Sequence, residues 1–315
     1  GVVGSTIIKV LEEQNMMPSK LFLVASEKSV GKIVNCFGKQ FSIVSIDEAL
    51  NGKPDFAIFS AGKNVSLKYA PLFADAGIVV IDNSSAWRMC NDVPLVVPEI
   101  NADAIGNSRI IANPNCSTIQ LVLALSKLHE AFKIKRVVVS TYQSVTGSGK
   151  KGIDQLNAER SGVVCNDKAY HYQIDLNLIP HAGSFLDNDY TEEEMKLVCE
   201  TRKILNDNEL QISPTVVRVP VFGGHSESVN VEFFNDFDLD EAVQVLKSTS
   251  GVTVIDDVAN NVYPMPLFAE GKDDVFVGRI RRDLSNANAL NMWIVSDNLR
   301  KGAATNAVQI LKSMI

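Results

Sequence analysis

Short hydrophobic runs alternate with amphipathic segments over the first third of the chain. The hydrophobic runs predict buried strands at 21–26, 56–60, 78–82 and 110–112, and the amphipathic segments predict helices at 65–76 and 101–105. Buried strands alternating with helices are typical of a doubly wound, mostly parallel sheet. Ligands of such sheets bind at the carboxyl ends of the strands.

The pattern changes after a long helix predicted at 119–132. Longer strands with alternating polarity are predicted at 136–142, 216–221, 229–234, 275–281 and 290–296. They indicate a mixed sheet in a second domain. Thr191 and Glu194 have the spacing of a capping box, which predicts a helix to about Leu205. We therefore expect one domain at 1–116 plus 297–315 and another at 117–296.

The first residues have the pattern of a nucleotide-binding loop. Gly1 and Gly4 precede the amphipathic run 7–13, like the second half of a glycine-rich phosphate loop and the helix that follows it. Such a loop needs a buried strand and a first glycine before it. We expect both to lie before Gly1 in the natural protein.

Cys116 lies in a predicted turn from strand to helix. Unpaired N–H groups and the positive end of the helix dipole favour a thiolate there, and the thiolate is the nucleophilic form of cysteine. The alternative is a small buried core cysteine, which is the commoner role of a lone cysteine.

Composition narrows the class of protein. Hydrophobic residues at 46% and charged residues at 21% are ordinary for a globular chain. The net charge of −7 argues against a nucleic-acid partner, and no apolar run approaches the roughly 20 residues that span a bilayer. The five cysteines are scattered without metal-ligand spacing, so we expect no metal and a reducing cytoplasm.

Polar residues at the predicted strand ends suggest a cofactor. Ser26, Lys28 and Ser29 follow the strand that would meet the adenosine ribose, and they suit the 2′-phosphate of NADP, although Glu27 lies among them. Ser60, Gly62 and Asn83 follow the next strands and would meet phosphates and nicotinamide.

Several motifs occur together in one order: Asp82-Asn83-Ser84-Ser85-Ala86-Trp87-Arg88, Val97-Pro98-Glu99-Ile100-Asn101, Asn113-Pro114-Asn115-Cys116-Ser117-Thr118, Ser140-Thr141-Tyr142-Gln143, Glu193-Glu194-Met195-Lys196, Arg218-Val219-Pro220-Val221-Phe222, Gly224-His225-Ser226 and Asp297-Asn298-Leu299. With them the whole chain resembles aspartate-semialdehyde dehydrogenase. The resemblance implies a Rossmann-type NADP-binding domain, and an α+β catalytic and dimerisation domain with a mixed sheet. It also implies a homodimer or homotetramer.

The resemblance implies a reaction as well. The family reduces L-aspartyl 4-phosphate with NADPH to L-aspartate 4-semialdehyde and phosphate, on the route to lysine, threonine and methionine. The implied catalytic residues are Cys116 as nucleophile, His225 as acid–base and Gln143, which orients the substrate. The implied substrate-binding residues are Arg88, Asn115, Glu193, Lys196 and Arg218. The implied cofactor-binding residues are Gly1, Gly4, Ser26, Lys28, Ser29, Ser60, Gly62, Asn83, Ser144, Gly147 and Asn298.

Residue chemistry agrees with several of these roles. His225 is the one histidine in a Gly-Gly-His-Ser loop after a strong strand, and histidine suits proton transfer near neutral pH. Arg218 can bind a carboxylate through two parallel hydrogen bonds. Glu193 can pair with an ammonium, or merely with Lys196 in a surface salt bridge at i, i+3 spacing. Lysine at position 28, where many relatives carry arginine, could weaken the preference for NADP.

Two other functions compete with this one. A related acyl-phosphate reductase, such as N-acetylglutamyl-phosphate reductase, would take an acetylated substrate that has no ammonium for Glu193 to bind. A catalytically silent binding protein on the same scaffold would not need the cysteine, the histidine and the anion-binding side chains.

Overall fold

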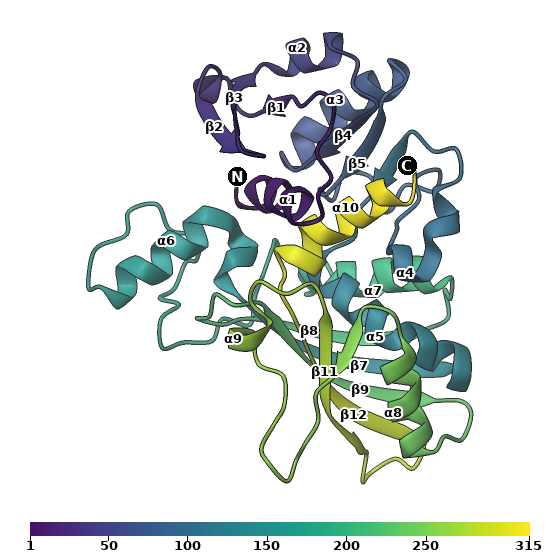
Figure 1. Ribbon diagram of the computed structural model, residues 1–315. Helices are drawn as coiled ribbons and strands as arrows, with labels where there is room; N and C mark the ends of the chain where they lie inside the picture. Colours follow the sequence, from purple (N-terminus) through teal and green to yellow (C-terminus); the bar gives the residue numbers. More distant parts are fainter. The chain divides into compact units, whose positions relative to one another are not determined.

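The computed structural model describes residues 1–315 and divides into two compact units (Figure 1). The first unit is Gly1–Pro114 with Ala303–Ile315, and the second is Asn115–Gly302. Asn115, Cys116 and residues 297–302, which the sequence assigned to the first domain, fall in the second unit. Cys116 does so because it begins helix α5 (Cys116–Phe132), which packs on α7 and on the sheet of that unit.

The first unit contains a three-stranded parallel sheet in the order β4-β5-β6. Its strands are β4 (Phe56–Phe59), β5 (Val79–Asp82) and β6 (Ile110–Ala112). Phe59 pairs with Asp82 and Asp82 pairs with Ala112, so the three carboxyl ends are level. The residues that follow the strands therefore come together at one edge of this sheet.

Helices surround these strands in the first unit. Hydrophobic side chains of α3 (Lys63–Asp75) and α10 (Thr305–Lys312) join the buried clusters of the sheet, and α1 (Val2–Glu13) packs on α10. The unit also contains two short helices, α2 (Ile46–Asn51) and α4 (Pro98–Asn101). The helix predicted at 101–105 is a 3-10 turn, Ala102–Ile105, that continues α4.

A second small sheet in this unit has the order β1-β3-β2. The strand predicted at 21–26 is reduced to β1 (Leu23–Val24), which runs parallel to β3 (Lys39–Val44). The sequence did not predict β3 or its antiparallel neighbour β2 (Ile33–Cys36). Both are short and half exposed, and a turn through Phe37 and Gly38, each with positive φ, joins them.

The second unit is built on a six-stranded mixed sheet, in the order β10-β11-β12-β9-β7-β8. Its strands are β7 (Ile134–Gln143), β8 (Gln211–Arg218), β9 (His225–Phe233), β10 (Val252–Val254), β11 (Val275–Arg282) and β12 (Ala289–Ser296). The prediction of 216–221 was wrong at both ends, because β8 starts at Gln211 and stops at Arg218, two residues before Pro220. His225 begins a strand instead of lying in a loop.

Helices α5, α7 (Glu192–Leu205) and α8 (Leu239–Ser248) pack on this sheet. Most residues of α5 are buried. The capping box at Thr191 is confirmed, since its hydroxyl accepts from Glu194 N–H and the Glu194 side chain accepts from Thr191 N–H. Helix α8 was not predicted, and neither were two further helices, α6 (Gly149–Arg160) and α9 (Pro266–Ala269).

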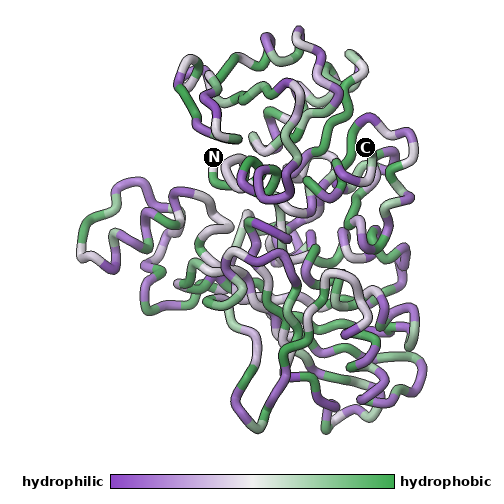
Figure 2. The backbone as a smooth tube through the Cα atoms, viewed as in Figure 1, coloured by the Kyte–Doolittle hydropathy of each residue, from purple (hydrophilic) through white to green (hydrophobic).

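Figure 2 shows hydrophobic and hydrophilic residues alternating along the tube, with hydrophobic stretches in the strands of both units. No helix is both long and apolar enough to cross a membrane.

Candidate active site

Cys116 is the first residue of α5, one position inside the helix start. Asn115 is the N-cap, and its Oδ1 accepts from the N–H groups of Ser117 and Thr118 at 3.0 and 3.3 Å. The thiol is partly exposed, which does not fit the alternative of a core cysteine. Its Cβ lies where a side chain on Gly302 would stand, 2.9 Å from the position of an added Cβ. Gly302 therefore lets the backbone approach Cys116 closely.

Two carboxylates of α7 hold the residue before the cysteine. Asn115 donates its Nδ2 to Glu193 Oε1 at 2.8 Å and its backbone N–H to Glu200 Oε2 at 2.7 Å. Glu200 is buried and was missed by the sequence reasoning. Its position seven residues after Glu193 (200 − 193 = 7), on the same helix face, was the signal available.

Glu193 is a buried, charged carboxylate. Its second oxygen accepts from Lys196 Nζ at 2.9 Å, and Gln143 Nε2 lies 3.4 Å from the first. Burial alone would raise its pKa, but Lys196, Asn115 and nearby Arg218 together lower the pKa to about 2. The pair with Lys196 exists at i, i+3 spacing. Glu193 is only 9% exposed, however. The two residues therefore form a largely buried ion pair and not the surface salt bridge considered from sequence.

Gln143 ends β7 and connects the sheet to the start of α5. Its Nε2 donates to Ser117 Oγ at 2.9 Å, and the side chain is buried. The amide therefore lies one residue along the helix from Cys116.

Arg218 ends the neighbouring strand β8, where it is paired with Gln143. Its guanidinium is buried and donates from Nη1 to the Ser144 carbonyl at 2.8 Å, while Nε has no hydrogen-bond partner. A buried donor without a partner costs about 1–3 kcal/mol. Arg218 can thus offer Nε to an anionic group.

His225 is fully buried at the start of β9. Its Nδ1 accepts from the Ser144 N–H at 3.1 Å, and its Nε2 has no hydrogen-bond partner. Burial first, and then the Arg218 charge, lower its pKa to about 3 against the opposing effect of Glu193. The ring is therefore neutral near pH 7.

Three residues expected at the cofactor lie in this second unit. Ser144 caps the 3-10 turn Val145–Ser148, and Asn298 Oδ1 accepts from Thr146 Oγ1 at 3.0 Å. A Cβ added to Gly147 would lie 2.8 Å from Arg218 Nη1 and 3.2 Å from His225 Nε2. A glycine is needed at 147 because the side chains of Arg218 and His225 fill that space.

Arg88 belongs to the first unit and is buried there. Its Nε donates to the Asn113 carbonyl at 2.9 Å and its Nη2 to the Asn83 carbonyl at 2.8 Å. Asn113 also donates its amide to Asn83 Oδ1 at 2.9 Å. These bonds join the residues that follow β5 and β6, the two strands whose carboxyl ends are level.

The same edge of the parallel sheet can hold a nucleotide. Ser60 and Gly62 follow β4 and are exposed, and Gly62 has a φ of +87° as N-cap of the 13-residue helix α3. Nothing lies within 4 Å of a Cβ built there. A helix N-terminus reached through an open glycine is a common binding site for a phosphate.

The other expected cofactor residues lie elsewhere in this unit. Gly1 is the N-cap of α1 and Gly4 lies inside it. Ser26 and Lys28 are exposed, and Ser29 partly exposed, around the 3-10 turn Glu27–Ser29.

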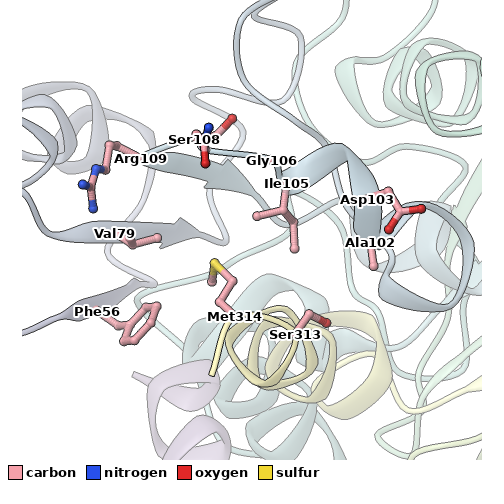
Figure 3. Close-up of a pocket in the computed structure, with 11 residues that line it drawn as sticks. Phe56, Val79, Ala102, Asp103, Ile105, Gly106, Ser108, Arg109, Ser313 and Met314 are labelled. Carbon is pink, nitrogen blue, oxygen red and sulfur yellow. The ribbon is translucent and has the colours of Figure 1, made fainter.

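A cavity of about 570 Å³ lies at the opposite edge of the same sheet (Figure 3). Phe56, Val79 and Arg109 line it at the amino ends of β4, β5 and β6. Because sheets of this kind bind ligands at the carboxyl ends, we assign the candidate site to the residues above and not to this cavity.

The family comparisons give the class of protein, a semialdehyde dehydrogenase with an NAD-binding unit and a dimerisation unit. Residues 1–108 match the family described as "Semialdehyde dehydrogenase, NAD binding domain", and residues 125–301 match "Semialdehyde dehydrogenase, dimerisation domain". The chain belongs to the semialdehyde dehydrogenase family, among the aspartate-semialdehyde dehydrogenases.

Individual relatives agree with this assignment. The chain is 49% identical to the aspartate-semialdehyde dehydrogenase of Aquifex aeolicus, over 100% of this chain and 95% of the relative. The structure of aspartate semialdehyde dehydrogenase II of Vibrio cholerae complexed with ASA is 45% identical with a TM-score of 0.95, over 100% of this chain and 95% of that one. The Candida albicans enzyme with NADP, at 24% identity and a TM-score of 0.77 over 100% and 95%, shares the fold.

Proposed function

We propose that the chain reductively dephosphorylates L-aspartyl 4-phosphate to L-aspartate 4-semialdehyde with NADPH, reversibly, through a thioester on Cys116. The observation that carries the proposal is the cluster around the start of α5. A partly exposed cysteine at a helix N-terminus is joined through Asn115 to a buried carboxylate, and a buried arginine with an unpaired donor lies close to that carboxylate.

The covalent step belongs to Cys116. Its thiolate attacks the acyl carbon, the carbon–oxygen bond to phosphate breaks, and a thioester remains. A nicotinamide cofactor, when bound, would supply the hydride for reduction of this thioester. The aldehyde then forms as the carbon–sulfur bond breaks and the thiolate returns. Gln143, which donates to Ser117, orients the acyl group beside the sulfur. His225 is the acid–base group for the thiol proton and for the oxygen of the hemithioacetal.

Charged side chains bind the charged groups of the substrate. Glu193 remains ionised at any pH above about 2, so it can bind the α-ammonium. Arg218 binds the α-carboxylate, and Lys196 and Arg88 hold the phosphate. An acetylated substrate would place an uncharged amide against the buried Glu193 carboxylate, which is why we favour aspartyl phosphate over N-acetylglutamyl phosphate.

NADP is the proposed cofactor over NAD. Ser60, Gly62 and Asn83, with Gly1 and Gly4, would hold its phosphates and nicotinamide, and Ser144, Gly147 and Asn298 would complete the site. The support for the 2′-phosphate is the exposed turn that carries Ser26, Lys28 and Ser29. The solved Candida albicans relative has NADP.

The proposed assembly is a homodimer or a homotetramer. The proposed compartment is the cytoplasm. Tyr142 and Trp293, with ring centroids 5.4 Å apart, are half-buried on the sheet of the second unit. Trp293 and Ser228 line a hollow of about 370 Å³ there. Residues 125–301 match a family described as a dimerisation domain, and this match supports the proposed assembly.

The test is an assay of phosphate-dependent oxidation of L-aspartate 4-semialdehyde with NADP⁺, followed by absorbance of the reduced cofactor. We expect turnover that requires both phosphate and semialdehyde, and less turnover with N-acetylglutamate semialdehyde. Preference for the acetylated aldehyde, or turnover without phosphate, would contradict the proposal.

A further inference from the structure

The irregular segment that follows helix α6 is held on that helix by two of its side chains. Gln155 Oε1 accepts from the N–H groups of Ala169 and Tyr170 at 2.8 and 2.9 Å. One turn further along, Glu159 Oε2 accepts from the N–H groups of residues 174–175 at 2.9 and 2.8 Å. Gln155 Nε2 also donates to Glu159 Oε1 at 2.8 Å. Four backbone groups outside any helix or strand are thus satisfied, and the backbone of Tyr170 is fixed on the helix.

The side chain of Tyr170 is held as well. Its hydroxyl donates to Ser148 Oγ at 2.9 Å, and its ring packs on a hydrophobic cluster that includes Val145 and Leu156. A Cβ added to Gly152 would lie 3.0 Å from the hydroxyl oxygen and 2.5 Å from the Val145 carbonyl oxygen, so a glycine is needed there. The backbone, the hydroxyl and the ring of Tyr170 therefore have separate contacts, which together fix how the ring is presented.

The ring of Tyr170 lies against Arg218. The guanidinium carbon lies over the ring, 5.9 Å from its centroid, which is within the range of a cation–π attraction. Burial raises the pKa of the Tyr170 hydroxyl, and the Arg218 charge is the largest of the effects that lower it. Arg218 also donates from Nη1 to the Ser144 carbonyl at 2.8 Å, while its Nε has no partner. The ring and the carbonyl therefore hold the guanidinium and leave one donor for a ligand.

We propose that Tyr170 is a positioning residue whose ring keeps Arg218 oriented toward the α-carboxylate of the substrate. This inference rests on the carboxylate-binding role of Arg218 in the proposed function. The hydroxyl is bound to Ser148, so the ring is the part of Tyr170 that acts on the arginine. An arginine side chain has several rotatable bonds, and binding must supply the free energy that orders it unless the protein has ordered it already. The contact with Tyr170 removes part of that cost before the substrate binds.

Two substitutions separate the ring from the hydroxyl. Tyr170→Leu removes the aromatic face and keeps an apolar side chain, whereas Tyr170→Phe removes only the hydroxyl. The assay is the steady-state, phosphate-dependent oxidation of L-aspartate 4-semialdehyde. We expect Tyr170→Leu to lower kcat/KM for the semialdehyde about 3- to 30-fold, the value of a cation–π contact at a partly desolvated site. Tyr170→Phe should stay within about twofold of the parent.

The kinetic constant that changes distinguishes positioning from a general structural role. The loss in Tyr170→Leu should lie in KM for the semialdehyde, with KM for phosphate and for NADP⁺ within about twofold of the parent. Tyr170→Met fills the space with a different side chain that also lacks an aromatic face, so it should show the same pattern. Tyr172→Leu, at an exposed tyrosine of the same segment, is the control and should keep the constants of the parent.

Three results would overturn the proposal. The first is an unchanged KM for the semialdehyde in Tyr170→Leu and Tyr170→Met. The second is a loss in Tyr170→Phe equal to the loss in Tyr170→Leu, which would assign the effect to the hydroxyl. The third is an equal rise of KM for all three substrates, which would mean a general structural role.

A double-mutant cycle tests whether Tyr170 acts through Arg218. In an Arg218→Met background, adding Tyr170→Leu should change kcat/KM by less than about twofold, because the guanidinium on which the ring acts is already gone. A further loss as large as in the parent background would place the action of Tyr170 elsewhere and overturn the proposal. Failure of the proposed function would be seen in the parent itself, as the absence of phosphate-dependent turnover of the semialdehyde.

Discussion

Replacing Glu193 with glutamine removes a buried negative charge and keeps the shape of the side chain. In the parent, the carboxylate accepts from Asn115 and Lys196 at 2.8 and 2.9 Å. Glutamine can still accept one of these bonds through its carbonyl oxygen, but it loses the attraction to Lys196 and to Arg218. The variant therefore measures what the charge contributes to the stability of the second unit.

The lowered pKa of Glu193 gives the size of the charge's contribution to stability and the direction in which that contribution changes with pH. Folding lowers the pKa of Glu193 from 4.5 to about 2, and the side chain is largely buried, so the difference corresponds to about 3 kcal/mol. Because the folded pKa is the lower one, this stability is fully present above the ordinary pKa of 4.5 and is lost as the pH falls toward 2. We expect the parent to exceed Glu193→Gln by about 3 kcal/mol at pH 7 and by about 1 kcal/mol at pH 3.

The assay is urea denaturation followed by fluorescence in a Trp87→Phe background. That substitution leaves Trp293 as the single tryptophan, and Trp293 lies in β12 of the second unit. Glu192→Gln is the matched control, since Glu192 is its exposed neighbour in the first turn of the same helix. It should cost no more than about 1 kcal/mol, the value of one charge at a helix N-terminus.

Two results would refute the reasoning. One is a Glu193→Gln variant as stable as the control at pH 7. The other is a stability difference from the parent that stays constant between pH 7 and pH 3, which would mean that the carboxylate does not titrate with a lowered pKa.

Three further substitutions test other parts of the site. Lys28→Ala should raise KM for NADPH far more than for NADH in parallel assays, because the lysine would pair with the 2′-phosphate; equal effects would exclude that role. Arg218→Lys keeps the charge but loses the planar fork, so steady-state kinetics should show kcat/KM for the semialdehyde about 10- to 100-fold lower, and an unchanged value would place the carboxylate elsewhere. Asn115→Ala removes the cap of α5 and should lower the free energy of unfolding by about 1–2 kcal/mol together with kcat; intact kcat would show that the cap does not position Cys116.

The parts of the fold with strong hydrophobic periodicity could be predicted from sequence. The parallel strands before Cys116, the long helix after it and the capped helix at Thr191 all have local signals: buried runs, 3.6-residue spacing and a capping box. The hairpin of β2 and β3 was not predicted, because its strands are short and half exposed, so neither shows a long buried run. Residues 219–221 are apolar but not strand, since Pro220 cannot donate to a sheet ladder.

The candidate site was foreseeable only in part. The position of Cys116 at a helix start follows from the strand and helix on either side of it. The roles of Glu200 and Ser144 do not follow from the neighbouring sequence. Glu200 binds a backbone N–H 85 residues away in sequence, and Ser144 holds His225 through its own N–H, 81 residues from the ring. The spacing from Glu193 places Glu200 on the same helix face, but no local pattern tells which backbone group a side chain binds over such separations.

The thioester on Cys116 is the central claim, and mass spectrometry of the enzyme mixed with L-aspartyl 4-phosphate in the absence of NADPH tests it most directly. Without reduction the thioester should accumulate, so the peptide that contains Cys116 should gain the mass of one aspartyl group and lose it when NADPH is added. Cys116→Ala should show no adduct and no turnover while still binding NADPH. An adduct on another residue, or turnover by Cys116→Ala within about tenfold of the parent, would contradict the account.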